Sequence, residues 1–123
     1  MRDAQGSSGE PIVDMQVIQG LRELGGEEDP GLVVEIIDMF LDDAPSRMRE
    51  IENALKIGDI TTLERAAHTL KSSSANVGAV SLSHICQKME TLAHKRLLDE
   101  IPSLVSSSRK TLGDVAAVLR SIQ

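Results

Sequence analysis

Three side chains within one short stretch have the types and spacing for phosphoryl chemistry: His68, Lys71 and Ser72. A neutral imidazole is a good nucleophile near pH 7, because the pKa of histidine is about 6.5. His68 can therefore attack a phosphoryl group and form a phosphoramidate. On a helix, Lys71 is close enough to offset the incoming charge, and the Ser72 hydroxyl can donate a hydrogen bond to a phosphoryl oxygen.

The sequence lacks the motifs that transfer a phosphoryl group from ATP. It has no glycine-rich phosphate loop, no evident carboxylate cluster for Mg²⁺ and no base arranged to activate water. We therefore expect a phosphohistidine carrier without a cofactor rather than an autonomous kinase. The three histidines form no helical ligand pair, and Cys86 is the single cysteine, so no metal centre is expected.

The element that must position these side chains is a helix over about residues 60–77. Asp59 is a suitable N-cap, and Gly78 begins the turn that ends the helix. At about 100° per residue, His68 lies beside the apolar stripe, where solvent begins, and Ser72 lies on the same flank. The expected inward positions are Ile60, Leu63, Ala67, Leu70, Ser74 and Val77.

The N-terminal part of the chain is predicted to contribute a tail and one short helix. Residues 1–12 are rich in Gly and Ser and lack a hydrophobic period, which is typical of a disordered tail. A short helix then runs from about Asp14 to Leu24 and is stopped by two glycines. We expect a single folded domain over residues 13–123.

A long helix is predicted to follow, with Asp29 as its N-cap and Pro30 in its first turn. Its apolar stripe keeps one phase across Pro45, so we expect one bent helix, kinked near Asp43, rather than two helices. Gly58 is expected to end it. The stripe consists of Val33, Ile37, Phe40, Ala44, Met48, Ile51 and Leu55.

Two further amphipathic helices complete the expected fold. One begins at Ser81 as its N-cap, and the other runs from about Ile101 to Ile122. No segment alternates with period two over the length of a strand. Four long helices with short connections predict an all-α, antiparallel up-down four-helix bundle with a short additional N-terminal helix. The inward positions expected after Ser81 are Leu82, Ile85, Met89 and Leu92.

Composition restricts the classes of partner. The formal net charge of -6 argues against a nucleic-acid binder, and the chain has one Phe and no Trp or Tyr on which bases could stack. No apolar run approaches the roughly 20 residues that span a bilayer, so we expect no membrane insertion. A lone Cys86, expected to be a small, partly buried apolar residue rather than a nucleophile, fits a reducing compartment. A cytoplasmic monomer is the expectation.

The run AHTLKSSSANVGA, from Ala67 to Ala79, resembles the signature of histidine-containing phosphotransfer (HPt) domains. The similarity extends to the FLDDAP segment that begins at Phe40 and to the junction between Gly58 and Asp59. It covers most of the chain from about residue 14. In that family an exposed histidine on a four-helix bundle takes a phosphoryl group from an aspartate of one receiver domain and passes it to an aspartate of another.

The resemblance also implies residue roles. His68 is expected to be the phosphorylated residue and Lys71 the family's supporting lysine. The implied partners are receiver domains of hybrid sensor kinases and response regulators. Ser72 departs from the family's commonest pattern, which has glycine directly after that lysine. A serine side chain is still small, so we expect receiver docking to persist.

The surface that docks a partner is expected around the same flank. It would consist of Glu64, Arg65, Ala75 and Asn76 beside Ser72, with a contribution from the helix that contains Met48. Affinity should be modest, so that partners can exchange.

Two other classes of protein compete with the carrier. The phosphoacceptor region of a sensor kinase also places a histidine on a helical bundle. It usually has an acidic residue directly after the histidine, whereas here Thr69 and Leu70 follow. In a helical adaptor without phosphoryl chemistry, His68 would be incidental.

Overall fold

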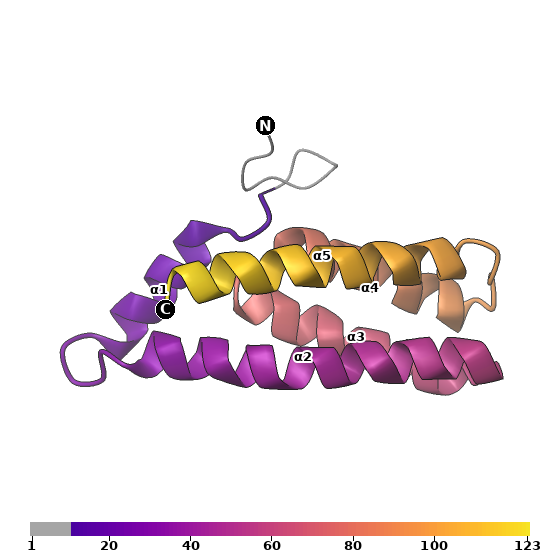
Figure 1. Cartoon of the computed structure of the whole chain (residues 1–123), viewed down its shortest axis with the longest axis horizontal. Coiled ribbons are helices and arrows are strands. Elements are labelled where there is room, and N and C mark those ends of the chain that lie inside the picture. Colours follow the sequence, from indigo (N-terminus) through magenta and orange to yellow (C-terminus); the bar gives the residue numbers. More distant parts are fainter. Residues whose placement is uncertain (1–10) are drawn as a thin grey trace.

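The computed structural model describes residues 11–123, which form five helices (Figure 1). They are α1 (Met15–Gly25), α2 (Leu32–Ile57), α3 (Ile60–Asn76), α4 (Val80–His94) and α5 (Ile101–Ser121). The four long helices pack along one another and reverse direction at each connection, whereas α1 lies obliquely at the end where α2 begins. The described residues contain no strand and no helix long and apolar enough to cross a membrane. The predicted antiparallel four-helix bundle with a short N-terminal helix is confirmed.

Several helix ends follow capping signals in the sequence. The Asp14 carboxylate accepts a hydrogen bond from the backbone N–H of Gln16 at the start of α1. Asp59 accepts one from the backbone N–H of Thr62 at the start of α3. Gly58 ends α2 with a φ of 77°, a left-handed conformation that glycine adopts without a steric penalty. Asp59 and Gly58 therefore act as predicted.

Two other predicted caps are wrong. α2 begins at Leu32, because Asp29 lies in a preceding turn and its backbone carbonyl accepts from the Leu32 N–H at 3.2 Å. Gly31 stands at the cap position and offers no side-chain hydrogen bond. Ser81 lies inside the first turn of α4, and the residue before that helix is Ala79, which is fully buried. Local turn geometry and apolar burial decide these two helix starts.

α2 continues through Pro45 as one helix. A proline inside a helix cannot donate the usual backbone hydrogen bond. Ala44 and Met48, on the two sides of the proline, are nonetheless both buried, so the apolar face runs on across it. The prediction of one helix in place of two is confirmed.

Buried apolar side chains from all five helices form one core. Most of the predicted inward positions are buried. On α4, however, the buried face is rotated, so that at two places the residue after the predicted one is buried. Cys86 and Ala93 are fully buried there, whereas Ile85 and Leu92 are only partly buried. The other predicted positions that remain partly exposed are Leu55 and Ile60.

The packed part of the chain begins before α1. Ile12 and Val13 are buried, so the predicted tail reaches too far along the chain; residues 1–10 of it lie outside the described residues. The Asp14 N–H donates to the Gly78 carbonyl at 2.7 Å. Gly78 has a φ of 76°, and a Cβ there would lie 2.7 Å from the Asp14 carbonyl oxygen. This close backbone contact fixes α1 against the turn between α3 and α4.

Candidate functional site

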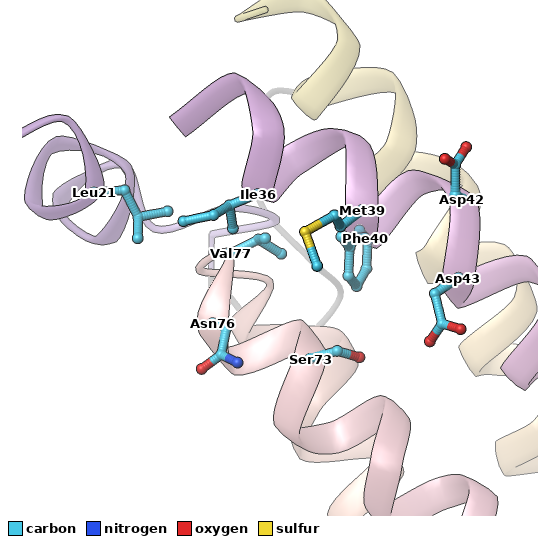
Figure 2. A pocket seen from close by; sticks show the side chains of 9 residues that line it. All are labelled: Leu21, Ile36, Met39, Phe40, Asp42, Asp43, Ser73, Asn76 and Val77. Carbon is cyan, nitrogen blue, oxygen red and sulfur yellow. The ribbon is translucent and has the colours of Figure 1, made fainter. Parts of the chain in front are cut away.

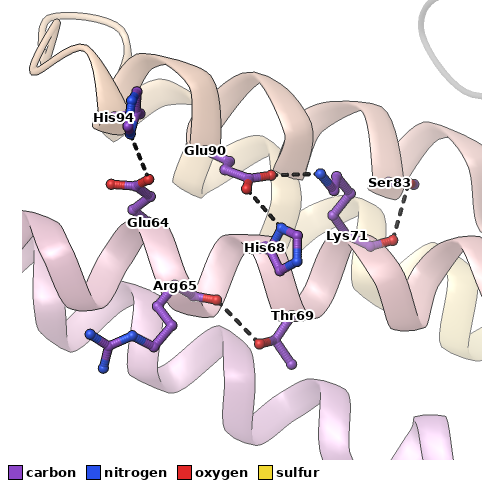
Figure 3. Close-up of polar contacts among 8 residues, drawn as sticks. All are labelled: Glu64, Arg65, His68, Thr69, Lys71, Ser83, Glu90 and His94. Atoms are coloured by element: carbon purple, nitrogen blue, oxygen red, sulfur yellow. Dashed lines mark hydrogen bonds and ion pairs between the residues drawn. The ribbon is translucent and has the colours of Figure 1, made fainter.

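Three ionisable side chains from two helices meet on one side of the bundle (Figure 3). His68 and Lys71 come from α3 and Glu90 comes from α4. Glu90 Oε2 lies 2.7 Å from His68 Nδ1, and Glu90 Oε1 accepts a hydrogen bond from Lys71 Nζ at 2.7 Å. One carboxylate therefore bridges the imidazole and the ammonium group through its two oxygens.

The helical period explains why these groups meet at the surface. Ala67 and Leu70 on α3 are fully buried, as is Met89 on α4, so the residues next to them fall at the boundary with solvent. The side chain of His68 is 58% exposed, whereas those of Lys71 and Glu90 are 27% and 22% exposed. The imidazole is thus open to a partner while the two charged groups are partly sheltered.

Glu90 determines which nitrogen of the His68 imidazole carries the proton. Partial burial acts to raise the pKa of Glu90, but hydrogen bonds and attraction from Lys71 and His68 outweigh it and hold the pKa below the usual 4.5. Glu90 is therefore a carboxylate at neutral pH and can only accept hydrogen bonds. It follows that His68 Nδ1 carries the proton and that Nε2 of the neutral ring has the free lone pair. Figure 3 shows this second nitrogen turned away from Glu90.

Ser72, which was predicted beside the histidine, is exposed one turn further along α3. Its hydroxyl makes no hydrogen bond within residues 11–123, so it is available to a bound group. The neighbouring Ser73 hydroxyl is instead satisfied by the Thr69 carbonyl at 3.2 Å. The structure brings His68 and Lys71 together through Glu90 and leaves Ser72 separate from that cluster.

The predicted docking residues fall into two groups. Glu64 and Arg65 line a shallow hollow of about 310 Å³ together with Thr61, His68 and Glu90. Ala75 and Asn76 are exposed near the other end of α3.

His94 is 76% exposed, but it is not merely solvated as its place at a helix end would indicate. Its Nδ1 lies 3.0 Å from Glu64 Oε2 (Figure 3). His84, also on α4, is exposed. Within residues 11–123, no three or more His, Cys, Asp or Glu side chains are grouped so as to hold a metal ion.

A larger, apolar hollow of about 680 Å³ lies where α1, α2 and α3 meet (Figure 2). Met39 on α2 is 69% exposed and borders it, so the methionine is not a core residue. Met48, on the same helix, is buried, and α2 therefore offers Met39 rather than Met48 to a partner. The full lining is Leu21, Ile36, Met39, Phe40, Asp42, Asp43, Ser73, Asn76 and Val77.

Cys86 is a small apolar residue, as the sequence indicated, but it is buried more completely than expected. Its side chain is fully buried in α4. Burial, with a smaller contribution from the charge of Glu90, raises the pKa of the thiol to about 12. The cysteine is therefore a small core residue and not a nucleophile.

Sequence reasoning missed Glu90. The signal that could have found it is its place directly after the core residue Met89, on the flank of the predicted helix. A helical wheel gives that flank but does not say which neighbouring helix faces it, and only the packing of α4 on α3 supplies the pairing.

Fold and site together define a class of protein: a helical bundle that presents an exposed histidine, held by a carboxylate from the next helix. The chain belongs to the Hpt domain family, whose family model matches residues 35–121. The resemblance seen in the sequence is thereby confirmed.

Relatives and solved structures agree with this family. The chain is 25% identical over 96 residues to the phosphorelay intermediate protein YPD1 of Candida albicans, covering 78% of this chain and 50% of the relative. It is 31% identical over 86 residues to histidine-containing phosphotransfer protein 2 of Oryza sativa subsp. japonica, covering 68% and 56%. The chain thus spans about half the length of these two relatives. The crystal structure of histidine-containing phosphotransfer protein B from Pseudomonas aeruginosa is similar with a TM-score of 0.83 and 30% identity, over 90% of this chain and 93% of that one.

Proposed function

We propose that the protein is a phosphohistidine carrier of a multistep phosphorelay. His68 accepts a phosphoryl group from an aspartate of one receiver domain and passes it to an aspartate of another. The observation that carries this proposal is the 2.7 Å contact between Glu90 and Nδ1, which leaves Nε2 of an exposed ring as the nucleophile. Family membership and the names of the relatives support it.

The transfer needs no proton to move on the imidazole. Nε2 attacks phosphorus in the acyl phosphate of a receiver, the P–O bond to the receiver carboxylate breaks, and the carboxylate leaves with the electron pair. The ring keeps its proton on Nδ1 and becomes cationic, and Glu90 faces this new charge. The same steps in reverse deliver the group to a second receiver.

Lys71 and Ser72 support this step in different ways. Lys71 holds Glu90 in place by an ion pair of 2.7 Å, so it acts on the ring through the carboxylate. Ser72 lies on the same helix one turn from His68, and its hydroxyl, unbonded within residues 11–123, can donate to a phosphoryl oxygen. Its extra atoms, compared with the glycine usual in the family, also limit how closely a partner backbone can approach.

Receiver domains of hybrid sensor kinases and response regulators are the proposed partners. The apolar hollow beside Met39 and the exposed residues Ala75 and Asn76 lie along α3 from His68, and Glu64 and Arg65 flank the ring itself. An exposed apolar hollow on the helix that carries His68 suits a transient interface of modest affinity. We propose that the chain acts as a cytoplasmic monomer and has no kinase activity of its own.

The decisive experiment is phosphotransfer from a receiver domain that carries labelled phosphate on its aspartate. Label that is acid-labile and alkali-stable should appear on the protein and be lost in His68→Gln. His94→Gln is the matched control, because that histidine is also exposed and also lies beside a glutamate, and it should be labelled normally. Labelling of His68→Gln, or labelling from ATP without a kinase, would contradict the carrier proposal. Absence of transfer from every receiver tested would favour a helical adaptor.

A further inference from the structure

The charged groups around His68 differ in whether they already have a partner. Glu90 is paired with Lys71 and with the ring, and Glu64 is paired with His94. Arg65 is exposed, and within residues 11–123 its guanidinium makes no hydrogen bond or ion pair. Its charge acts from a distance on the Asp59 carboxylate and helps to lower the pKa of that group. Among the described residues, Arg65 is therefore a cation that can bind an anion in this hollow without first leaving another partner.

The position of Arg65 also suits a group on Nε2. Arg65 lies three positions before His68 on α3, so the two side chains are neighbours on the helix surface, and both line the same hollow. Lys71 does not line it. Figure 3 shows Lys71 on the flank of α3 that faces α4, whereas Arg65 extends away from α4. Because Nδ1 faces Glu90 on α4, a group on Nε2 forms on the side of the ring away from that carboxylate.

The two cations differ in what binding a phosphoryl group would disrupt. Lys71 would have to leave Glu90, and the partly sheltered carboxylate would then lose its strongest partner. Within the described part of the chain Arg65 has no ion pair to break, and its guanidinium can bind two phosphoryl oxygens at once. We propose that Arg65 is the cation that binds the phosphoryl group on His68, and that Lys71 is a positioning residue which acts through Glu90. This inference rests on the proposed phosphorylation of His68 and goes beyond a docking role for Arg65.

A chemical donor tests Arg65 without any receiver. In zwitterionic phosphoramidate, Nε2 attacks phosphorus, the P–N bond breaks, and ammonia leaves with its electron pair and the protons it already carries. The ³¹P resonance of phosphorylated His68 is identified by its absence in His68→Gln. The titration of this resonance gives the second pKa of the phosphoryl group, which is about 6 for phosphate monoesters. Arg65→Gln should raise this pKa, and Arg65→Lys should bring it most of the way back to the wild-type value. Lys71→Gln should change the pKa less than Arg65→Gln does.

The equilibrium constant of transfer from a phosphorylated receiver separates phosphoryl binding from docking. For free reactants and products this constant does not depend on how tightly the two proteins dock. Arg65→Gln should shift it toward the receiver by about threefold to tenfold, as expected for one partly exposed charge pair. Arg120→Gln on α5 removes the same charge from an exposed site and should leave it unchanged.

Each outcome has one meaning. An unchanged titration and equilibrium constant in Arg65→Gln, or a larger effect of Lys71→Gln on the phosphoryl pKa, would overturn the assignment to Arg65. Slower transfer with both quantities unchanged would also overturn it, since that result marks a docking residue. Failure of every receiver to label the wild type would count against the proposed function alone, because the titration with phosphoramidate would still report on Arg65.

Discussion

Gly78→Ala should destabilise the protein more than an ordinary glycine substitution, and Gly58→Ala provides a matched control. Both glycines have nearly the same left-handed backbone, with φ values of 76° and 77°. The substitution therefore imposes the same strain on each, about 1 kcal/mol or somewhat more. Any gain from the lower entropy of the unfolded chain is also shared.

The two positions differ in the space around them. A Cβ on Gly58 meets nothing within 4 Å, whereas one on Gly78 would lie 2.7 Å from the Asp14 carbonyl oxygen and 3.1 Å from Val17 Cβ. Backbone atoms must move to relieve the first contact, and the hydrogen bond from Asp14 to the Gly78 carbonyl is strained as they do. Overpacking of this kind costs about 1–3 kcal/mol. Gly78→Ala should therefore lower the free energy of unfolding by about 2–4 kcal/mol and Gly58→Ala by about 1 kcal/mol.

Urea denaturation followed by far-ultraviolet circular dichroism measures both values. This signal suits a helical bundle, and the chain has no Trp or Tyr to report by fluorescence. Equal losses of stability in the two variants would refute the reasoning, because they would show that α1 yields freely at its contact with the turn. If α1 does shift, Gly78→Ala should also weaken receiver binding, since Leu21 on α1 lines the apolar hollow.

Three further predictions concern the site and its surroundings. Cys86, whose burial raises its pKa to about 12, should resist a thiol reagent in the native protein at pH 8 and react fully in denaturant, as absorbance of the released thiolate would show. The pKa of Glu90 is lowered in the folded state, so its ionised carboxylate adds stability above its usual pKa, and this stability is lost as the pH falls through the folded value. Urea midpoints should therefore fall more steeply below pH 4.5 in the wild type than in Glu90→Gln. Parallel curves for the two proteins would contradict this. Met39→Glu should weaken receiver binding at least about fivefold in titration calorimetry with little change in stability, whereas Met15→Glu, exposed outside the hollow, should bind as the wild type does.

The sequence was sufficient for features that depend on one helix at a time. The 3.6-residue period placed Ala67 and Leu70 inward and His68 at the edge of solvent, because burial of one apolar face dominates how an amphipathic helix lies. Asp59 and Gly58 were also predictable, since each satisfies backbone groups within a few residues of itself.

Features that depend on contacts between helices were not predictable. Glu90 reaches the imidazole only because α4 packs on α3 at one rotation, and a shift in the phase of α4 by one residue would turn it elsewhere. The exposed Met39 borders a hollow that α1, α2 and α3 form together, so the hollow depends on how three helices pack. Ser81 was misassigned because the buried Ala79 fixed the start of α4 earlier than a serine cap would.

The paired groups of the site have a consequence for how the molecule folds and fluctuates. His68 and Glu90 are 22 positions apart in the chain, and both belong to the helical hairpin formed by α3 and α4. Contacts this local form early and cost little chain entropy to close. The imidazole and its carboxylate should therefore be assembled as soon as the hairpin exists. Transient local unfolding of α1 or α5 would leave them in place, so a phosphorylated ring would keep its geometry while the outer helices exchange their amide protons.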